Sequence, residues 1–297
     1  MMDEKTLKDL IDALIEDKKS ERRFRIISRL IILSLFLIIF TLPFFSSDNL
    51  YKAGNHTAVI NISGIISPGG DSTKKTIDLI SKAINNDLCE NIILNVNSPG
   101  GSATQSKIIF DQISRIKKTS DKTIYSIIDD VGASRGYYIA ASGDIVIANS
   151  SSIVGSIGVR LDSINIQSLA EKLGIVSQTI SSGEDKTMLD PLQPLTKKQR
   201  DHLNKLVTDI HDDFIQDIKT ARGEKIKDNS VFTGLFWTGQ QALQLGLIDE
   251  VGSIYDINQK YLNNSNLVTY NKKPSFIEEL MQSIISNYSS MPIGISY

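Results

Sequence analysis

The hydrophobic pattern divides the chain into a polar start, one long apolar run, and then short apolar segments that alternate with amphipathic ones. Residues 1–25 are rich in charge, whereas the run 30–45 carries no charged side chain. With Ile26 and Ile27, this run approaches the roughly 20 residues that a membrane-spanning helix needs. It is apolar on every face, which does not suit a helix at the surface of a soluble domain. We therefore predict a transmembrane helix at 26–45.

Four arginines stand directly before this run: Arg22, Arg23, Arg25 and Arg29. Positive residues mark the cytoplasmic end of a membrane helix, so we expect the tail 1–25 in the cytoplasm and everything after the helix on the extracytoplasmic side. No pair of small residues spaced for signal-peptide cleavage follows the run, which favours an uncleaved signal anchor. A polar linker, 46–57, comes next.

Beyond the linker, the pattern has the period of strands and helices in alternation. It predicts strands at 58–66, 91–96, 123–128 and 144–148, and helices at 74–84 and 102–118. Strands that alternate with helices are typical of an α/β domain with a mostly parallel sheet. We place this domain at 58–262.

The second half of the domain continues less regularly. Its pattern predicts a helix over 163–173, a strand over 176–180, and a helix that starts at Thr238. Thr196 is a typical N-cap, and it opens a long helix that ends near Arg222.

The predicted C-terminal tail, 263–297, is a polar stretch followed by an amphipathic segment. Its apolar positions share one face of a helix: Phe276, Ile277, Leu280, Met281, Ile284 and Ile285. Such a segment can dock on a neighbouring subunit, lie on a membrane surface, or be loosely ordered. The sequence does not rank these three alternatives.

Composition excludes several classes of protein. A net charge of -2 and a pI of about 6.0 argue against a nucleic-acid binder, which usually has a strong basic excess. The single cysteine, Cys89, excludes an intrachain disulfide. The three histidines, His56, His202 and His211, have no metal-ligand spacing with cysteine or acidic residues. We therefore expect neither a metal nor another cofactor.

The stretch from Val131 to Ala148 carries the most chemistry. Small residues crowd its start, and they let a substrate backbone approach closely. Ser134 stands between a predicted strand and a predicted buried helix, whose N-terminus favours developing negative charge. Ser134 is thus a candidate nucleophile, although close packing of a helix on a sheet would produce the same pattern.

Four further motifs surround this serine in order: Ser98-Pro-Gly-Gly101, Val154–Gly158, Glu171–Ile175 and Ser182–Lys186. Together with Ala133–Ala140, they resemble the SppA-type signal peptide peptidases, the protease IV family. The resemblance covers about 58–253 in a single copy, as in the short form of that family. It implies a ClpP/crotonase-like fold, a spiral of ββα units with a mostly parallel sheet.

A serine hydroxyl needs a base before it can attack a carbonyl at neutral pH. No histidine follows Ser134 closely, which favours a lysine as the base, and the resemblance implies that this lysine is Lys186. A lysine acts as a base only when neutral, so its pKa must fall from about 10.4 to about 7–8, a direction that burial supplies. The resemblance also implies that Ser156 orients the lysine amine. A solvated loop lysine and an ordinary turn serine are the alternatives.

The oxyanion of an acyl transfer needs two fixed donors, and we expect the backbone N–H groups of Gly101 and Arg135 in this role. Arg135 departs from the family pattern, which has glycine after the nucleophile. Its guanidinium could narrow the pocket or contact an acidic group. Thr187 stands where an acidic residue is usual. Both departures bear on substrate preference more than on the Ser134–Lys186 dyad.

We therefore expect a membrane-anchored serine endopeptidase that degrades short apolar peptides such as cleaved signal peptides. The resemblance implies a homo-oligomeric ring, an octamer, on the extracytoplasmic side of the bacterial inner (cytoplasmic) membrane. Two alternatives stay open: an inactive scaffold of the same fold, with Arg135 blocking the site, and a crotonase-type acyl-CoA enzyme. Extracytoplasmic placement argues against the second alternative, because coenzyme A is cytosolic.

Overall fold

The computed structural model describes residues 18–19, 22–34 and 54–271. The chain divides into two units, 1–52 and 53–297, which are described separately. In the first unit, residues 22–34 form a helix. Across the described ranges, no helix has both the length and the apolar character to cross a membrane.

Parts of the predicted segments lie outside the described residues. These are 35–45 of the predicted transmembrane helix, most of the linker, and 272–297 of the predicted C-terminal tail. The membrane anchor therefore stays a prediction.

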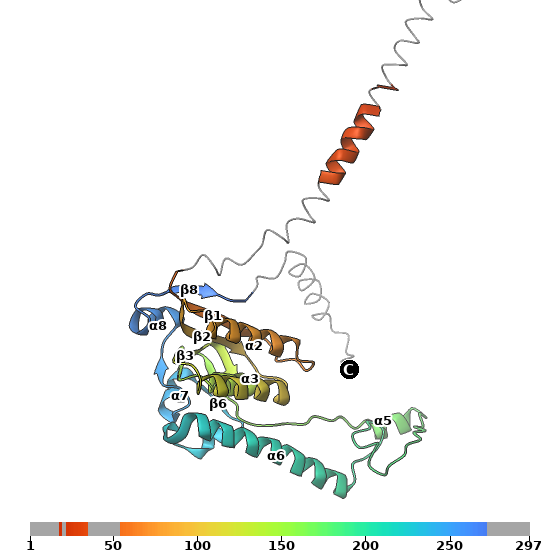
Figure 1. Cartoon of the computed structure of the whole chain (residues 1–297). Helices are drawn as coiled ribbons and strands as arrows, with labels where there is room; N and C mark the ends of the chain where they lie inside the picture. The colour runs from red at the N-terminus through yellow and green to blue at the C-terminus, as the bar shows by residue number, and fades with distance from the viewer. Residues whose placement is uncertain (1–17, 20–21, 35–53, 272–297) are drawn as a thin grey trace, which may run out of the picture. The chain divides into compact units, whose positions relative to one another are not determined.

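The second unit is built on one eight-stranded sheet (Figure 1). Its strands are β1 (His56–Ser63), β2 (Cys89–Ser98), β3 (Ile124–Ala133), β4 (Ile145–Ala148), β5 (Ile153–Gly155), β6 (Phe236–Thr238), β7 (Glu250–Val251) and β8 (Asn266–Thr269). The order is β6-β5-β3-β2-β1-β8, and β4 pairs with both β3 and β7. All pairings among these strands are parallel except β5 with β6. The prediction of a mostly parallel α/β sheet is confirmed.

Seven α-helices accompany the sheet in the second unit: α2 (Asp71–Ile84), α3 (Ala103–Ile116), α4 (Arg135–Ala140), α5 (Gln167–Lys172), α6 (Lys197–Arg222), α7 (Gly239–Leu245) and α8 (Ile254–Tyr261). Side chains alternate between the two faces of a strand, so each strand contributes to a hydrophobic core on each face of the sheet. On one face, Val59, Ile93 and Ile127 pack with Ile257 of α8. The intervening residues are also buried, and the helices α2, α3 and α4 that follow β1, β2 and β3 lie over them.

Helix starts follow the local sequence closely. Thr196 caps α6 and Thr238 caps α7, each in a capping box with the glutamine three residues later. Both predicted N-caps are confirmed, as is the end of the long helix at Arg222.

Two predictions for the stretch before α6 have different outcomes. The helix predicted at 163–173 is present but shorter, at Gln167–Lys172, whereas the strand predicted at 176–180 is wrong, because these residues form no strand. Val176 and Ile180 are 78% and 101% exposed, so they pack on nothing within the described part of the chain. A strand is stabilised by its neighbour, and no described strand lies beside this segment. Figure 1 shows α5 and its loops near the first turns of α6, beyond the body of the sheet.

Candidate active site

Ser134 lies at the sharp turn between β3 and α4. Its φ of 51° and ψ of -122° belong to a region that side chains other than glycine rarely adopt, at a cost of about 1–3 kcal/mol. The surrounding sheet holds it there: Ala133 pairs with Gly155, and the Ser134 N–H donates to the Gly155 carbonyl at 2.7 Å. The turn ends the strand abruptly and leaves the serine partly exposed.

Ser156 repeats this geometry on the neighbouring strand. Its φ is 53°, and its N–H donates to the Leu235 carbonyl at 2.6 Å. Because Ala133 is opposite Gly155 in a parallel register, the next residues along, Ser134 and Ser156, are neighbours at the same sheet edge. Both serines line one cavity.

The glycine-rich turn after β2 lies directly against this serine. A Cβ on Gly100 would stand 3.0 Å from both the Arg135 nitrogen and the Ser134 Cβ. A Cβ on Gly136 would stand 2.3 Å from the Ser98 carbonyl oxygen. Glycine at both positions is therefore what lets the turn and the start of α4 touch.

Two backbone N–H groups at this contact are available to a ligand. Arg135 is the first residue of α4, and the first N–H groups of a helix have no partner within it. The bridge between Ile66 and Gly101 is made by the Gly100 carbonyl and the Ser102 N–H, at 2.8 and 2.7 Å, so it does not use the N–H of Gly101. The two residues predicted as oxyanion donors, Gly101 and Arg135, line the same cavity as Ser134.

The cavity around Ser134 has a volume of about 860 Å³. Its polar end holds Gly101, Ser134, Arg135 and Ser156, and its walls include the apolar side chains of Leu161, Leu206, Val207 and Ile210. Arg160 and Asp162, which form an exposed ion pair at 3.3 Å, also line it. A cavity of this kind suits an apolar peptide held by a few polar groups.

Lys186 is not among the residues that line this cavity. It is exposed, in the loop between α5 and α6. Lys198 fastens this loop to the start of α6 through ion pairs with Glu184 at 3.3 Å and Asp185 at 3.1 Å. The structure therefore brings together four of the five predicted site residues, and the fifth, the lysine, stands apart within a single chain.

No histidine lines the cavity within the described residues. His56 is buried and contacts the Tyr270 hydroxyl at 2.9 Å, and His202 is exposed on α6. His211 lies outside the cavity lining, and its Nε2 is 3.2 Å from the carbonyl oxygen of Ile157, the residue that follows Ser156.

The Arg135 side chain is turned into the interior. It is 5% exposed, and its Cζ lies 4.3 Å from the ring centroid of Phe214 on α6 and 5.2 Å from that of Tyr138. Its Nη2 is buried and has no hydrogen-bond partner among the described residues. Burial lowers the pKa of Arg135, and the nearby Tyr138, Asp217 and Asp213 oppose that shift. The guanidinium thus packs against α6, and this contact connects α4 to a helix that lines the cavity.

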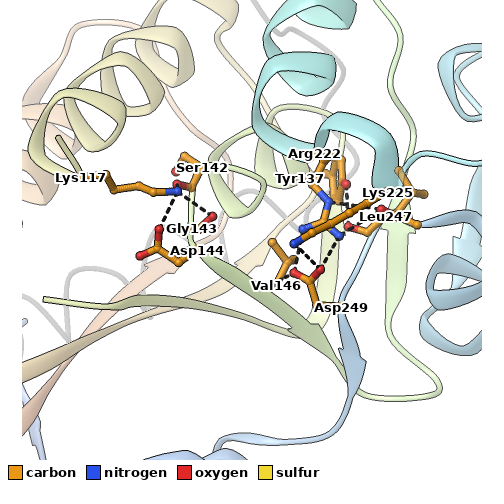
Figure 2. A network of polar contacts seen from close by, with 11 residues as sticks. Lys117, Tyr137, Ser142, Gly143, Asp144, Val146, Arg222, Lys225, Leu247 and Asp249 are labelled. Atoms are coloured by element: carbon orange, nitrogen blue, oxygen red, sulfur yellow. Dashed lines mark hydrogen bonds and ion pairs between the residues drawn. The ribbon is translucent and has the colours of Figure 1, made fainter. Parts of the chain in front are cut away.

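A buried polar network supports the far side of α4 (Figure 2). The Tyr137 hydroxyl donates to the Leu247 carbonyl at 2.7 Å. Beside it, Arg222 donates to Asp249 at 2.8 and 3.0 Å, and Asp249 accepts from the Val146 N–H at 2.8 Å. Burial raises the pKa of Asp249, but the hydrogen bonds from Arg222 and Lys225 outweigh it and hold the value at about 2.

A second contact fixes the end of α4. Lys117 donates to the carbonyls of Ser142 and Gly143, both at 3.1 Å, and pairs with Asp144 at 2.9 Å (Figure 2). A cation at a helix C-terminus satisfies free carbonyls and complements the helix dipole. Sequence reasoning missed Arg222, Asp249 and Lys117. An arginine in the last turn of a long helix and an aspartate after an apolar segment were the available signals.

An α/β protein with a strained serine at a strand-to-helix turn, facing two free backbone donors, has the site of a serine hydrolase. The sequence pattern of Peptidase family S49 matches residues 116–267, just over half of the chain. The chain therefore belongs to peptidase family S49, which confirms the resemblance to SppA-type peptidases.

Relatives support this membership. A Brucella melitensis protein named Na(+)/H(+) antiporter NhaA is 38% identical over 68% of this chain and 28% of its own length. Protease 4 of Haemophilus influenzae is 30% identical over 71% of this chain and 35% of its own length. An Enterococcus faecium protein with the provisional name signal peptide peptidase SppA is 28% identical over 71% of this chain and 65% of its own length. The chain thus matches less than two thirds of each of these relatives.

Proposed function

We propose that the chain is a membrane-anchored serine endopeptidase that degrades short apolar peptides such as cleaved signal peptides. The observation that supports it best is the position of Ser134, strained at the turn before α4, in one cavity with Arg135 and Gly101. The apolar walls of the cavity suit the substrate class. In this proposal 26–45 anchors the chain in the membrane, and the domain that follows works on the extracytoplasmic side.

The reaction follows from the geometry. The Ser134 hydroxyl attacks the scissile carbonyl and passes its proton to a base, which gives a tetrahedral intermediate. The N–H groups of Arg135 and Gly101 receive the oxyanion, and the loss of one such donor typically costs about 3 kcal/mol of transition-state stabilisation. The base then protonates the leaving amine, and water hydrolyses the acyl-enzyme by the same steps in reverse order.

The base in this proposal is Lys186 of a second copy of the chain. Lys186 is exposed and does not line the cavity of its own chain. The arm that carries it, residues 160–195, also exposes large apolar side chains: Ile164, Ile166, Leu169, Leu173, Ile175, Val176 and Ile180. So many exposed apolar side chains within one segment favour a protein–protein contact. Copies arranged in a closed ring would bury every arm and complete every site.

Peptide cleavage by the full chain in detergent micelles tests the proposal. Ser134→Ala and Lys186→Ala should each abolish hydrolysis of an apolar, signal-peptide-like substrate. Lys172→Ala removes another exposed lysine from the same arm, and it should retain activity. The wild-type rate should rise toward alkaline pH as the general base loses its proton.

Each alternative gives a different result. Activity that survives Lys186→Ala would assign the base to another group. A wild-type chain that assembles but does not hydrolyse peptides, and whose Ser134 does not react with a serine-directed probe, would indicate an inactive scaffold instead.

A further inference from the structure

A second groove lies on the face of the sheet that α8 covers. Its volume is about 770 Å³, and it shares no lining residue with the cavity around Ser134. The floor comes from side chains that point to the same face of adjacent strands: Val59 and Asn61 of β1, Asn95 of β2, Ile127 of β3, and Leu267 and Thr269 of β8. The rim includes Asp129, Asp130, Ser151, Ile153 and Tyr255.

This face of the sheet is only partly covered. Helix α8 buries its lower part through Ile257, which packs with Val59 and Ile127. Beyond α8, the rim exposes Ile153 to 41% and Tyr255 to 79%. The groove thus combines an apolar floor with polar side chains that can receive a peptide backbone.

The end of β8 lies beside this groove, because Leu267 and Thr269 line it. Tyr270 donates its N–H to the Val59 carbonyl at 2.9 Å. The Asn271 side chain then accepts from the Asn61 N–H at 2.6 Å and donates to the Asn61 carbonyl at 3.0 Å. Asn61 itself lines the groove and accepts from Asn95 at 3.1 Å. Asn271, the last residue that the structure describes, is therefore bonded to a residue of the groove wall.

The sequence after Asn271 is complementary to the groove. Lys272 and Lys273 come first, and two exposed carboxylates, Asp129 and Asp130, stand on the rim. The apolar positions that follow repeat at helical spacing: Phe276, Ile277, Leu280, Met281, Ile284 and Ile285. A tethered segment is present at an effective concentration of about millimolar, so even a weak contact would be occupied.

We propose that residues 272–297 bind in this groove of their own chain, with the lysines against the Asp129–Asp130 rim and the apolar face on Leu267 and Ile153, which line the groove and are not fully buried. The tail then completes the cover over the α8 face of the sheet. This site is separate from the Ser134 cavity, and the proposal does not depend on peptidase activity.

Disulfide trapping in the full chain tests the proposal, because the only native cysteine, Cys89, is buried. Ser151→Cys places a thiol on the rim, and Ser275→Cys, Ser283→Cys or Ser286→Cys places a second one in the tail. All of these replace a hydroxyl with a thiol of similar size. The matched control is Ser72→Cys, an exposed site on α2, the helix that lies over the other face. A third position, Thr233→Cys, marks the Ser134 cavity.

Under a mild oxidant, at least one tail cysteine should form an intrachain disulfide with Cys at 151 at least tenfold faster than with Cys at 72 or 233. Reversing the rim charge with Asp129→Lys and Asp130→Lys should slow that reaction at pH 7. Equal rates at positions 72 and 151 would overturn the proposal, as would fastest bonding at 233. Disulfides that form only between chains would assign the groove to a second copy instead.

Discussion

The two halves of the proposed dyad lie in regions that are built in opposite ways. Helix α4, which follows Ser134, is buried along its whole length and is fixed by hydrogen bonds at both ends. The arm that carries Lys186 is exposed, its ion pairs lie in solvent, and its apolar side chains have no cover within the described chain. In the described chain, the helix after Ser134 is thus held in place, whereas the segment around Lys186 is not packed against the cavity of the same chain.

The two regions also differ in how much their ion pairs contribute to stability. The Arg222 side chain is buried, and the Asp249 side chain is only 18% exposed; Asp249 also accepts from the Val146 N–H and pairs with Lys225. Loss of Asp249 would leave the buried Arg222 guanidinium without its carboxylate, which is costly. The pairs that Lys198 makes with the arm are more than 40% exposed at each side chain, and solvent-exposed pairs of this kind contribute little to stability. The arm can thus change partners at little cost, while the nucleophile's support cannot.

The largest expected effect comes from mixing two inactive chains. Ser134→Ala and Lys186→Ala should each lose on the order of a thousandfold or more in rate. When the two variants are co-assembled in equal amounts, about a quarter of the sites should combine an intact serine with an intact lysine from another copy. Hydrolysis should therefore return to about a quarter of the wild-type rate.

Two controls frame this experiment. Each variant assembled alone should stay inactive, and Ser134→Ala mixed with a Ser134→Ala, Lys186→Ala double variant should also stay inactive. If the co-assembled single variants remain inactive although mixed rings form, the base comes from the same chain, and the arm must close on its own cavity.

The next effect is on the support of α4. Arg222→Met should lower the free energy of unfolding by about 2–3 kcal/mol, because Asp249 loses the two hydrogen bonds from the guanidinium and keeps only the more exposed Lys225 as a cationic partner. Lys197→Met, which breaks an exposed pair with Asp201, should lower it by no more than about 1 kcal/mol. Urea unfolding of both variants measures the two values.

The same variant has a pH signature. The Asp249 pKa is about 2 in the folded chain and about 4 when unfolded, so its stabilising contribution is complete above about pH 4 and is lost as the pH falls toward 2. Arg222→Met should weaken this part of the acid dependence, because Lys225 and the Val146 N–H still stabilise the charged carboxylate. An unchanged acid limb would show that the pair does not hold the carboxylate in its charged form.

What could be predicted from the sequence follows the same division. The parallel sheet, the position of Ser134 before a buried helix, and the caps at Thr196 and Thr238 depend on local patterns that the fold of one chain satisfies. The strand predicted at 176–180 has a strand-like composition, but no neighbouring strand pairs with it in the described chain. The place of Lys186 could not be read either, because it depends on contacts that no local pattern specifies.

The direction of the Arg135 side chain could not be predicted from the sequence either. Its neighbour in space, Phe214, lies about 80 positions later, so only the fold shows that the guanidinium turns inward. The pair Arg222 and Asp249 likewise comes from two distant segments. Long-range burial decides both cases.

A smaller effect is expected at Arg135. Arg135→Met keeps most of the volume and removes a buried charge whose Nη2 has no partner in the described structure, so stability should stay equal or rise by about 1 kcal/mol. Arg135→Gly restores the family residue but leaves a cavity beside Phe214, and it should lower the free energy of unfolding by about 2–3 kcal/mol. Calorimetry of the two variants distinguishes the contribution of side-chain packing to stability from that of the charge. A methionine variant as unstable as the glycine variant would show that the charge itself stabilises α4.

The smallest effect on folding stability is expected at the arm, residues 160–195, where a substitution should affect assembly instead. Ile180 is fully exposed, so Ile180→Ser should change the free energy of unfolding by less than about 0.5 kcal/mol. If the arm packs on a second copy, the same substitution should shift the assembly toward monomers in analytical ultracentrifugation and reduce hydrolysis in proportion. Ile65→Ser, an equally polar change at another exposed isoleucine outside the arm, should leave both unchanged. Loss of assembly with unchanged folding stability would indicate that the arm contacts another copy. If the arm packed on its own chain instead, the substitution would lower the free energy of unfolding.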